Sequence, residues 1–181
     1  MGTIADIALR AAEARDIPGI TAIYAREVSG GTASFELEPP DEAEMERRRQ
    51  AIVAAGCPYL VAEAGGRVLG YAYAGPYRPR RAYRFTVEDS VYVGSEARGR
   101  GVGRLLLAAL VEAAAASGFR QMIAVIGDSE NRASVGLHAA LGFAPAGSLR
   151  NVGWKHGRWL DSVLMQRSLG AGDGAPPDPG R

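Results

Sequence analysis

The sequence has very little of two residue types on which disulfide-rich and metal-binding proteins depend. Cysteine occurs once in the 181 residues, at Cys57, which excludes an internal disulfide. Histidine occurs twice, at His138 and His156, and with Cys57 these are too few for a Cys/His metal cluster. We therefore expect no metal and a reducing compartment, the cytoplasm.

Long apolar runs and a strong excess of one charge are absent as well. Residues 1–7 lack a basic segment followed by an apolar one, and no apolar stretch reaches the length of a membrane span. With 21 basic and 20 acidic residues the net charge is +1, which favours neither nucleic acid nor an acidic membrane as partner. We expect a protein that binds neither.

The length suits one domain with a single core, which we assign to residues 1–169. Residues 170–181 are rich in glycine and proline and poor in apolar side chains, which predicts a flexible tail. Apolar periodicity predicts four helices, at about 16–29, 41–56, 102–117 and 131–141. It predicts strands at about 8–12, 59–64, 67–74, 83–93, 122–126, 143–149 and 158–165. This order indicates an α/β (α+β) fold with a mixed, mostly antiparallel sheet and one parallel crossover after the fourth strand.

One glycine-rich segment stands between a predicted strand and a predicted helix. It reads Ala97-Arg98-Gly99-Arg100-Gly101-Val102-Gly103-Arg104. Glycines let backbone N–H groups approach a ligand, the helix start adds partial positive charge, and the arginines add full charges. The segment lacks Gly-Lys-Ser/Thr and the G-x-G-x-x-G spacing, so it predicts another kind of phosphate cradle. The alternative is a glycine-rich turn with solvated arginines.

The spacing Arg98-x-x-Gly101-x-Gly103 resembles the Q/R-x-x-G-x-G/A signature of the GNAT family of N-acetyltransferases. The resemblance implies that this loop holds the pyrophosphate of acetyl-CoA and that the fourth and fifth strands splay apart to admit the cofactor. It also implies two further sets of contacts with the CoA arm, from the strand before the loop and from a later helix. The implied cofactor-binding residues are Val91, Tyr92, Val93, Arg98, Gly99, Arg100, Gly101, Val102, Gly103, Arg104, Asn131 and Ser134.

A narrower resemblance extends from Tyr71 to Asp161. Segments 71–76, 82–93, 125–127, 137–143 and 155–161 are similar to the phosphinothricin and methionine sulfoximine N-acetyltransferases. The resemblance implies transfer of an acetyl group to the α-amino group of a small amino acid analogue, a link to herbicide resistance, and the possibility of a homodimer. Polyamine or protein N-terminal acetylation, and a CoA-binding module without turnover, are the alternatives.

Transfer to an amine requires a base that removes a proton from the acceptor. The departing thiolate may also need an acid that supplies a proton. The resemblance favours Glu88 as the base, acting directly or through water, on the strand face of Ser90 and Tyr92; the alternative is a solvent-facing salt bridge with an arginine. His138 shares a helix face with Asn131 and Ser134, and the resemblance implies a catalytic acid or base there. Its alternative is a structural hydrogen bond. Cys57 is far in sequence from the cradle, which favours direct transfer in a ternary complex.

The acidic end of the acceptor needs cations or N–H donors. Residues 77–84 alternate arginine with tyrosine, and a guanidinium binds a carboxylate or phosphinate through two hydrogen bonds. The alternatives are a solvated loop and, against the balanced charge, a small RNA-binding patch. The resemblance favours Arg80 and Tyr83 over Arg78, Arg81 and Arg84. The predicted acceptor-binding residues are Phe35, Gly75, Tyr77, Arg80, Tyr83, Thr86 and Lys155. Lys155 is equally explained as a solvated turn lysine.

Overall fold

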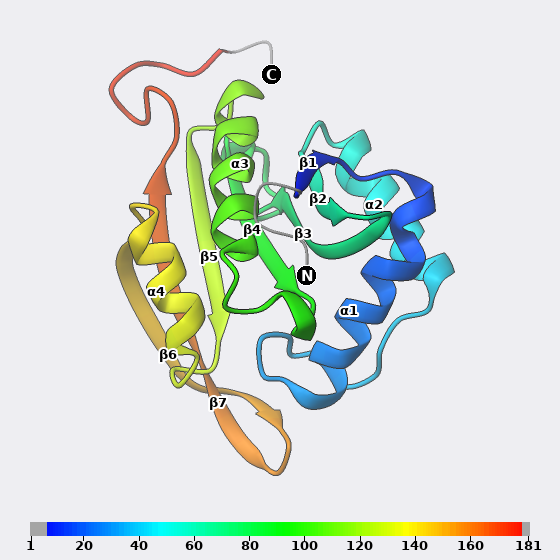
Figure 1. The fold of residues 1–181 in the computed structure, drawn as a ribbon. Coiled ribbons are helices and arrows are strands. Elements are labelled where there is room, and N and C mark those ends of the chain that lie inside the picture. Colours follow the sequence, from blue (N-terminus) through cyan, green and yellow to red (C-terminus); the bar gives the residue numbers. More distant parts are fainter. Residues whose placement is uncertain (1–6, 179–181) are drawn as a thin grey trace.

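The computed structural model describes residues 7–178, in which a seven-stranded sheet carries helices on both faces (Figure 1). The helices are α1 (Ile17–Gly30), α2 (Glu42–Ala54), α3 (Val102–Ala116) and α4 (Arg132–Ala140). The strands are β1 (Ala8–Ala11), β2 (Tyr59–Ala64), β3 (Arg67–Pro76), β4 (Thr86–Val93), β5 (Gln121–Gly127), β6 (Ala144–Lys155) and β7 (Arg158–Ser168). The strand order is β1-β2-β3-β4-β5-β7-β6.

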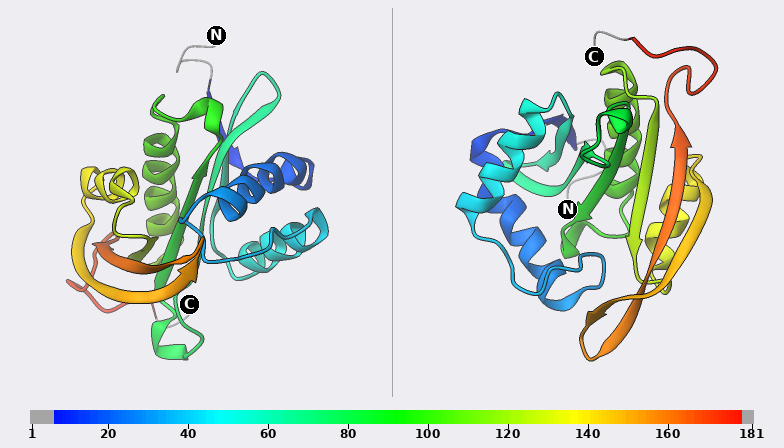
Figure 2. Two further views of the ribbon diagram at one scale, coloured as in Figure 1. Left: turned by 90° about the horizontal axis from the view of Figure 1, so that it is seen from below. Right: turned by 180° about the vertical axis from the view of Figure 1, so that it is seen from behind.

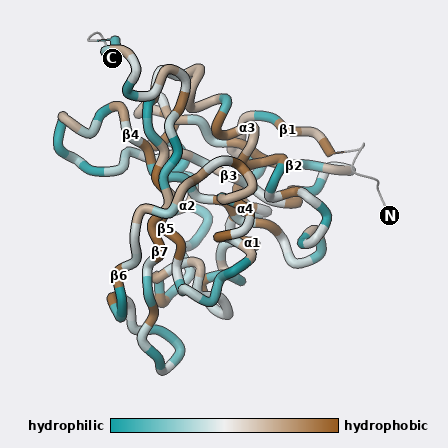
Figure 3. Tube along the Cα trace, turned by 90° about the vertical axis from the view of Figure 1, so that its left-hand side faces the viewer, coloured by the Kyte–Doolittle hydropathy of each residue, from teal (hydrophilic) through white to brown (hydrophobic). Residues whose placement is uncertain are grey.

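The two faces of the sheet have different residues and different helices. Ala62, Ala72 and Ala74 are fully buried on the face that packs against α3, where small side chains let the helix approach closely. Tyr59 and Tyr71 point to the opposite face, into a second core with α1 and α2. Figure 2 shows the sheet between these two helical layers, and Figure 3 shows the hydrophilic segments in the loops that project from it.

One pair of neighbouring strands separates along its length. Every strand pair is antiparallel except β4 and β5, which confirms the single parallel crossover. Their pairing runs from Thr86 opposite Gln121 to Asp89 opposite Ala124 and then stops, although both strands continue (Figure 1). Residues 90–93 of β4 remain paired with β3 alone. The predicted splay therefore begins after Asp89 and leaves one backbone edge of β4 free.

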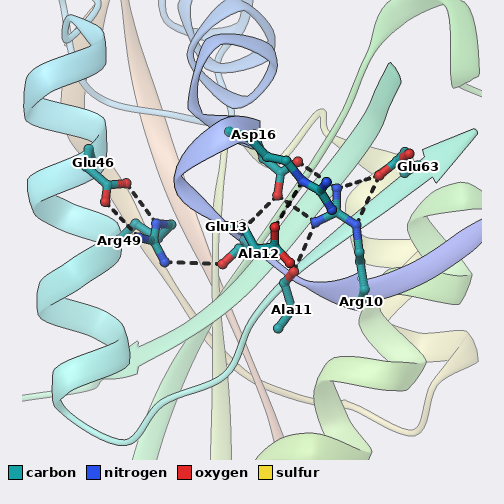
Figure 4. A network of polar contacts seen from close by, with 9 residues as sticks. Arg10, Ala11, Ala12, Glu13, Asp16, Glu46, Arg49 and Glu63 are labelled. Carbon is teal, nitrogen blue, oxygen red and sulfur yellow. Dashed lines mark hydrogen bonds and ion pairs between the residues drawn. The ribbon is translucent and has the colours of Figure 1, made fainter. Parts of the chain in front are cut away.

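A polar network holds the N-terminal segment to this sheet (Figure 4). Arg10 donates two hydrogen bonds of 2.7 Å to the buried carboxylate of Asp16 and also contacts Glu63 on β2. These hydrogen bonds lower the pKa of Asp16. Arg49 of α2 is bonded with Glu46 and donates to the Ala12 carbonyl at 3.2 Å. The start of α1 is thus fixed between β1, β2 and α2.

Three predicted strand boundaries were wrong, and the simplest is the end of the seventh strand, which lies at Ser168 and not near 165. The fourth strand begins at Thr86, because 81–83 form a 3-10 turn in which Tyr83 N–H donates to Arg80 and Arg84 N–H to Arg81. The sixth strand continues past 149 to Lys155, across an irregular register and a positive φ of 55° at Asn151. Asn and Gly in this stretch read as turn residues, yet the pairing with β7 resumes beyond them.

Candidate active site

A cavity of about 420 Å³ opens where β4 and β5 separate. It is bounded by the end of β4, the glycine-rich loop and the start of α4. Eleven of the twelve predicted cofactor-binding residues line it, namely Val91, Tyr92, Val93, Arg98, Gly99, Gly101, Val102, Gly103, Arg104, Asn131 and Ser134. Arg100 does not line it. We call this the donor cavity.

The loop at the donor cavity has the geometry that an anion requires. Gly99 and Gly101 have φ values of 71° and 79°, which L side chains rarely adopt, and neither would meet another atom if it carried a Cβ. Gly101 caps α3, so the first N–H groups of that helix lack partners within it and can bind a pyrophosphate. Arg98 forms an ion pair with Glu27 of α1 and donates to the Val93 carbonyl at 3.3 Å. These residues fit acetyl-CoA.

A second cavity, of about 400 Å³, lies on the α1 side of the same strands. We call it the acceptor cavity. Its lining residues are Ala33, Ser34, Phe35, Glu36, Tyr73, Glu88, Ser90, Tyr92, Val125, Gly127 and Ser162. Ala33 and Tyr92 line both cavities, so the two adjoin. The acceptor cavity thus lies next to the donor cavity at these two residues.

Glu88 is the acidic residue of β4 that faces the acceptor cavity. It shares the strand face of Ser90 and Tyr92 because side chains alternate along a strand. Burial and the negative charge of Asp89 raise the pKa of Glu88, and the positive charge of Arg78 opposes this rise. Among residues 7–178 no ion pair forms between Glu88 and an arginine, so the carboxylate is available to accept a proton.

His138 lies on the opposite side of the sheet from Glu88. Its ring is buried and lines neither cavity. Nε2 is 2.9 Å from Oδ2 of Asp89, and Nδ1 is 2.7 Å from the carbonyl of Ser134. Burial lowers the pKa of His138, but these two partners outweigh it and the pKa is raised. The surroundings are those of a structural hydrogen bond, and a catalytic role for His138 stays a prediction.

The predicted acid-recognition loop is divided between environments. Arg80, Tyr83 and Thr86 line a separate cavity of about 570 Å³ between the 77–84 loop, the end of α2 and Phe119. Tyr77 packs edge-on against Tyr83, with ring centroids 5.7 Å apart. None of these residues lines the acceptor cavity.

The remaining predicted acceptor-binding residues, and the neighbouring Arg78, lie in different surroundings. Arg78, which sequence reasoning ranked below Arg80, is the arginine whose charge acts on Glu88. Gly75 pairs with Glu88 across β3 and β4 and has open space where a side chain would stand. Of the predicted acceptor-binding residues, Phe35 alone lines the acceptor cavity. Lys155 is buried, lines none of the three cavities described and donates to the Ser34 carbonyl at 2.7 Å.

Several acceptor-cavity residues were missed in the sequence. Tyr73 had a detectable signal, because strand alternation places it on the face of Tyr71, and in the sheet it pairs with Ser90 of β4. Ser34 and Glu36 had none, since they lie in a loop whose position depends on tertiary contacts: Tyr24 of α1 is bonded with both, and Lys155 donates to the Ser34 carbonyl from 121 residues away. In the described residues no group of His, Cys, Asp and Glu could hold a metal ion. No helix there is long and apolar enough to cross a membrane.

Comparison with known proteins identifies the family of this chain. The model of the acetyltransferase (GNAT) family matches residues 19–143. The chain belongs to the GNAT family. It is an acetyl-CoA-dependent N-acetyltransferase, because its relatives are N-acetyltransferases and two solved structures that it resembles contain acetyl-CoA.

Individual relatives cover nearly the whole acetyltransferase. It is 59% identical to phosphinothricin N-acetyltransferase of Alcaligenes faecalis, over 90% of this chain and 83% of the relative. It is 46% identical to the L-methionine sulfoximine/L-methionine sulfone acetyltransferase of Pseudomonas paraeruginosa, over 93% of this chain and 98% of the relative. A phosphinothricin acetyltransferase of Sinorhizobium meliloti, solved with acetyl-CoA, superposes with a TM-score of 0.93 at 50% identity. The superposition covers 97% of this chain and 95% of that structure. The predicted GNAT fold is confirmed.

Proposed function

We propose that this acetyltransferase transfers the acetyl group of acetyl-CoA to the α-amino group of small amino acid analogues such as phosphinothricin, methionine sulfoximine and methionine sulfone. The observation that carries the proposal is the junction of the two cavities at Ala33 and Tyr92, with Glu88 on the acceptor side. The names of the relatives at 46% and 59% identity supply the acceptor class. Resistance to a herbicide of this class follows if phosphinothricin is accepted.

Direct transfer in a ternary complex is the mechanism we propose. Glu88 takes the proton from the acceptor ammonium, and its raised pKa makes it a better base than an exposed carboxylate. The free edge of β4 holds the pantetheine arm at Val91 to Val93. Cys57 is buried and lines only the cavity of the 77–84 loop, so an acetyl-cysteine step has no route in this arrangement.

Recognition of the acid end is assigned to the 77–84 loop. The influence of Arg78 on Glu88 supports it, since a cation close enough to lower the pKa of the base can also attract an anionic acceptor. Arg80 and Tyr83 belong to the same loop and are part of the proposal, although they line the separate cavity of that loop and not the acceptor cavity. Arg80→Ala should raise KM for acidic amino acid analogues more than for a neutral amine, and equal effects would refute this assignment.

A cytoplasmic homodimer is the final part of the proposal. Trp154 and Trp159 are 56% and 58% exposed on the β6–β7 hairpin and pack edge-on with each other, 5.2 Å between ring centroids. Leu149 and Val152 are exposed on the same hairpin, and contiguous exposed apolar side chains are typical of an interface. A cytoplasmic location is supported by the cysteine content, because a chain with one cysteine cannot form an internal disulfide.

A thiol-release assay with a panel of amines tests the proposal. Methionine sulfoximine, methionine sulfone and phosphinothricin should give higher kcat/KM than a polyamine or a peptide with a free N-terminus. A preference for the polyamine or the peptide would assign the enzyme to one of those acceptors instead. Acetyl-CoA binding without thiol release from any amine would indicate a binding module.

A further inference from the structure

Lys155 is a basic residue buried between two parts of the chain that are distant in sequence. It ends β6, and only 4% of its surface is exposed. Its Nζ donates a hydrogen bond of 2.7 Å to the carbonyl of Ser34, which lies 121 residues earlier in the loop after α1. Figure 2 shows this loop passing beside the β6–β7 hairpin.

The burial of Lys155 is unfavourable unless its contacts compensate for lost hydration. Burial lowers the pKa of the Lys155 ammonium, and the charges of Glu27 and Glu36 oppose that effect. A lysine at a hairpin turn ordinarily extends its charged end into water. Here the ammonium is instead turned inward onto a backbone carbonyl, an arrangement that fixes the position of that carbonyl.

The loop that Lys155 holds forms one wall of the acceptor cavity. Ser34, Phe35 and Glu36 all line the cavity. Glu36 is held within the loop by hydrogen bonds from its own N–H to Ser34 Oγ and from the Tyr24 hydroxyl to its carboxylate. A displacement of Ser34 would therefore move the neighbouring side chains that shape the acceptor cavity.

Other contacts hold the same loop against the strands. His156, the residue after Lys155, has Nε2 at 3.1 Å from the Gly31 carbonyl. A Cβ on Gly127 would lie 2.2 Å from the Thr32 carbonyl oxygen, and a Cβ on Gly153 would lie 2.4 Å from the Phe35 ring. The loop thus rests on the end of β5 and on β6 without spare room, and the hairpin is its support.

We propose that Lys155 is a positioning residue that fixes the 31–36 loop and thereby the geometry of the acceptor cavity. It does not line that cavity, so it acts through Ser34 and does not bind the acceptor itself. The effect on acceptor binding rests on the proposed function. The hydrogen bond from Lys155 to Ser34 is a property of the fold, so its effect on the loop can be measured without turnover.

The test compares Lys155→Met, which keeps the length of the side chain and removes the donor, with Lys155→Arg, which keeps a donor and the charge. Loss of a charge-assisted hydrogen bond should raise the acceptor KM about tenfold to hundredfold, with kcat changed only a few-fold. The rise should be equal for acidic and neutral acceptors, and the Arg variant should recover part of it. The dissociation constant of acetyl-CoA should stay within about twofold.

Arg150→Met is the matched control, because it removes an exposed cation from the same strand, and its KM should equal that of the wild type. Hydrogen exchange supplies the readout that is independent of activity: amides of residues 31–36 should exchange faster in Lys155→Met. A KM rise confined to acidic acceptors would overturn the inference in favour of direct binding. Unchanged KM and unchanged exchange would also overturn it. If the wild type were inactive on every amine of the thiol-release assay, the proposed function would be refuted. The hydrogen-exchange result would still show whether Lys155 fixes the 31–36 loop.

Discussion

Replacing Glu88 by Gln removes the proposed base while preserving size and hydrogen-bonding capacity. A positioned general base contributes about 10²–10⁴ in rate, equivalent to roughly 3–5 kcal/mol of activation free energy. Because burial and Asp89 raise the pKa of Glu88, its basicity exceeds that of an exposed carboxylate. We therefore expect kcat to fall at least about a hundredfold. The affinity for acetyl-CoA should be unchanged, since Glu88 does not line the donor cavity.

The pH dependence of kcat/KM gives the decisive comparison, measured by thiol release. A base must be deprotonated to act, so the wild-type rate should rise with pH through the pKa of Glu88, above the usual 4.5. This rise in kcat/KM should be absent from the pH profile of Glu88→Gln. A second rise, caused by deprotonation of the acceptor ammonium, should persist in both proteins. Near-normal turnover, or an unchanged acid limb in the variant, would refute the role of Glu88.

Three further substitutions test other parts of the structure. Gly101→Val places a branched side chain at a φ of 79° and should weaken acetyl-CoA binding severely. Calorimetric titration measures this affinity, and an unchanged value would contradict the expectation. Gly127→Ala forces the Thr32 carbonyl aside and should raise the acceptor KM about tenfold in steady-state assays; an unchanged KM would count against the tight contact. The raised pKa of His138 means that its bond with Asp89 stabilises fully below the unfolded pKa of about 6.5 and progressively less as pH rises through the folded value. The melting temperatures of wild type and His138→Gln should accordingly converge with increasing pH, and a constant gap would contradict this.

The donor cavity was predictable because its determinants are local in the sequence. Positive φ at Gly99 and Gly101 and the start of α3 all fall within a few residues, and their spacing carries the information directly. The splay of β4 from β5 followed from the family resemblance. Period-two alternation was enough to place Glu88 on one face of β4 with Ser90.

The acceptor cavity was predicted less well because its walls come from distant segments. Ser34 and Glu36 gain their positions from Tyr24 and Lys155, and no local pattern indicates those partners. The 3-10 turn that includes Tyr83 lies in the arginine loop, which lines a separate cavity, whereas the alternation of arginine with tyrosine had suggested contact with the acidic end of the acceptor. Long-range packing decides such loops, and propensity does not.

Initial-rate kinetics with acetyl-CoA and methionine sulfone both varied is the most direct test of the claim that the two cavities act as one site. Saturation in both substrates, with intersecting lines in double-reciprocal plots, is the result predicted for direct transfer across the junction at Ala33 and Tyr92. Parallel lines, or thiol release that does not depend on the amine, would contradict it.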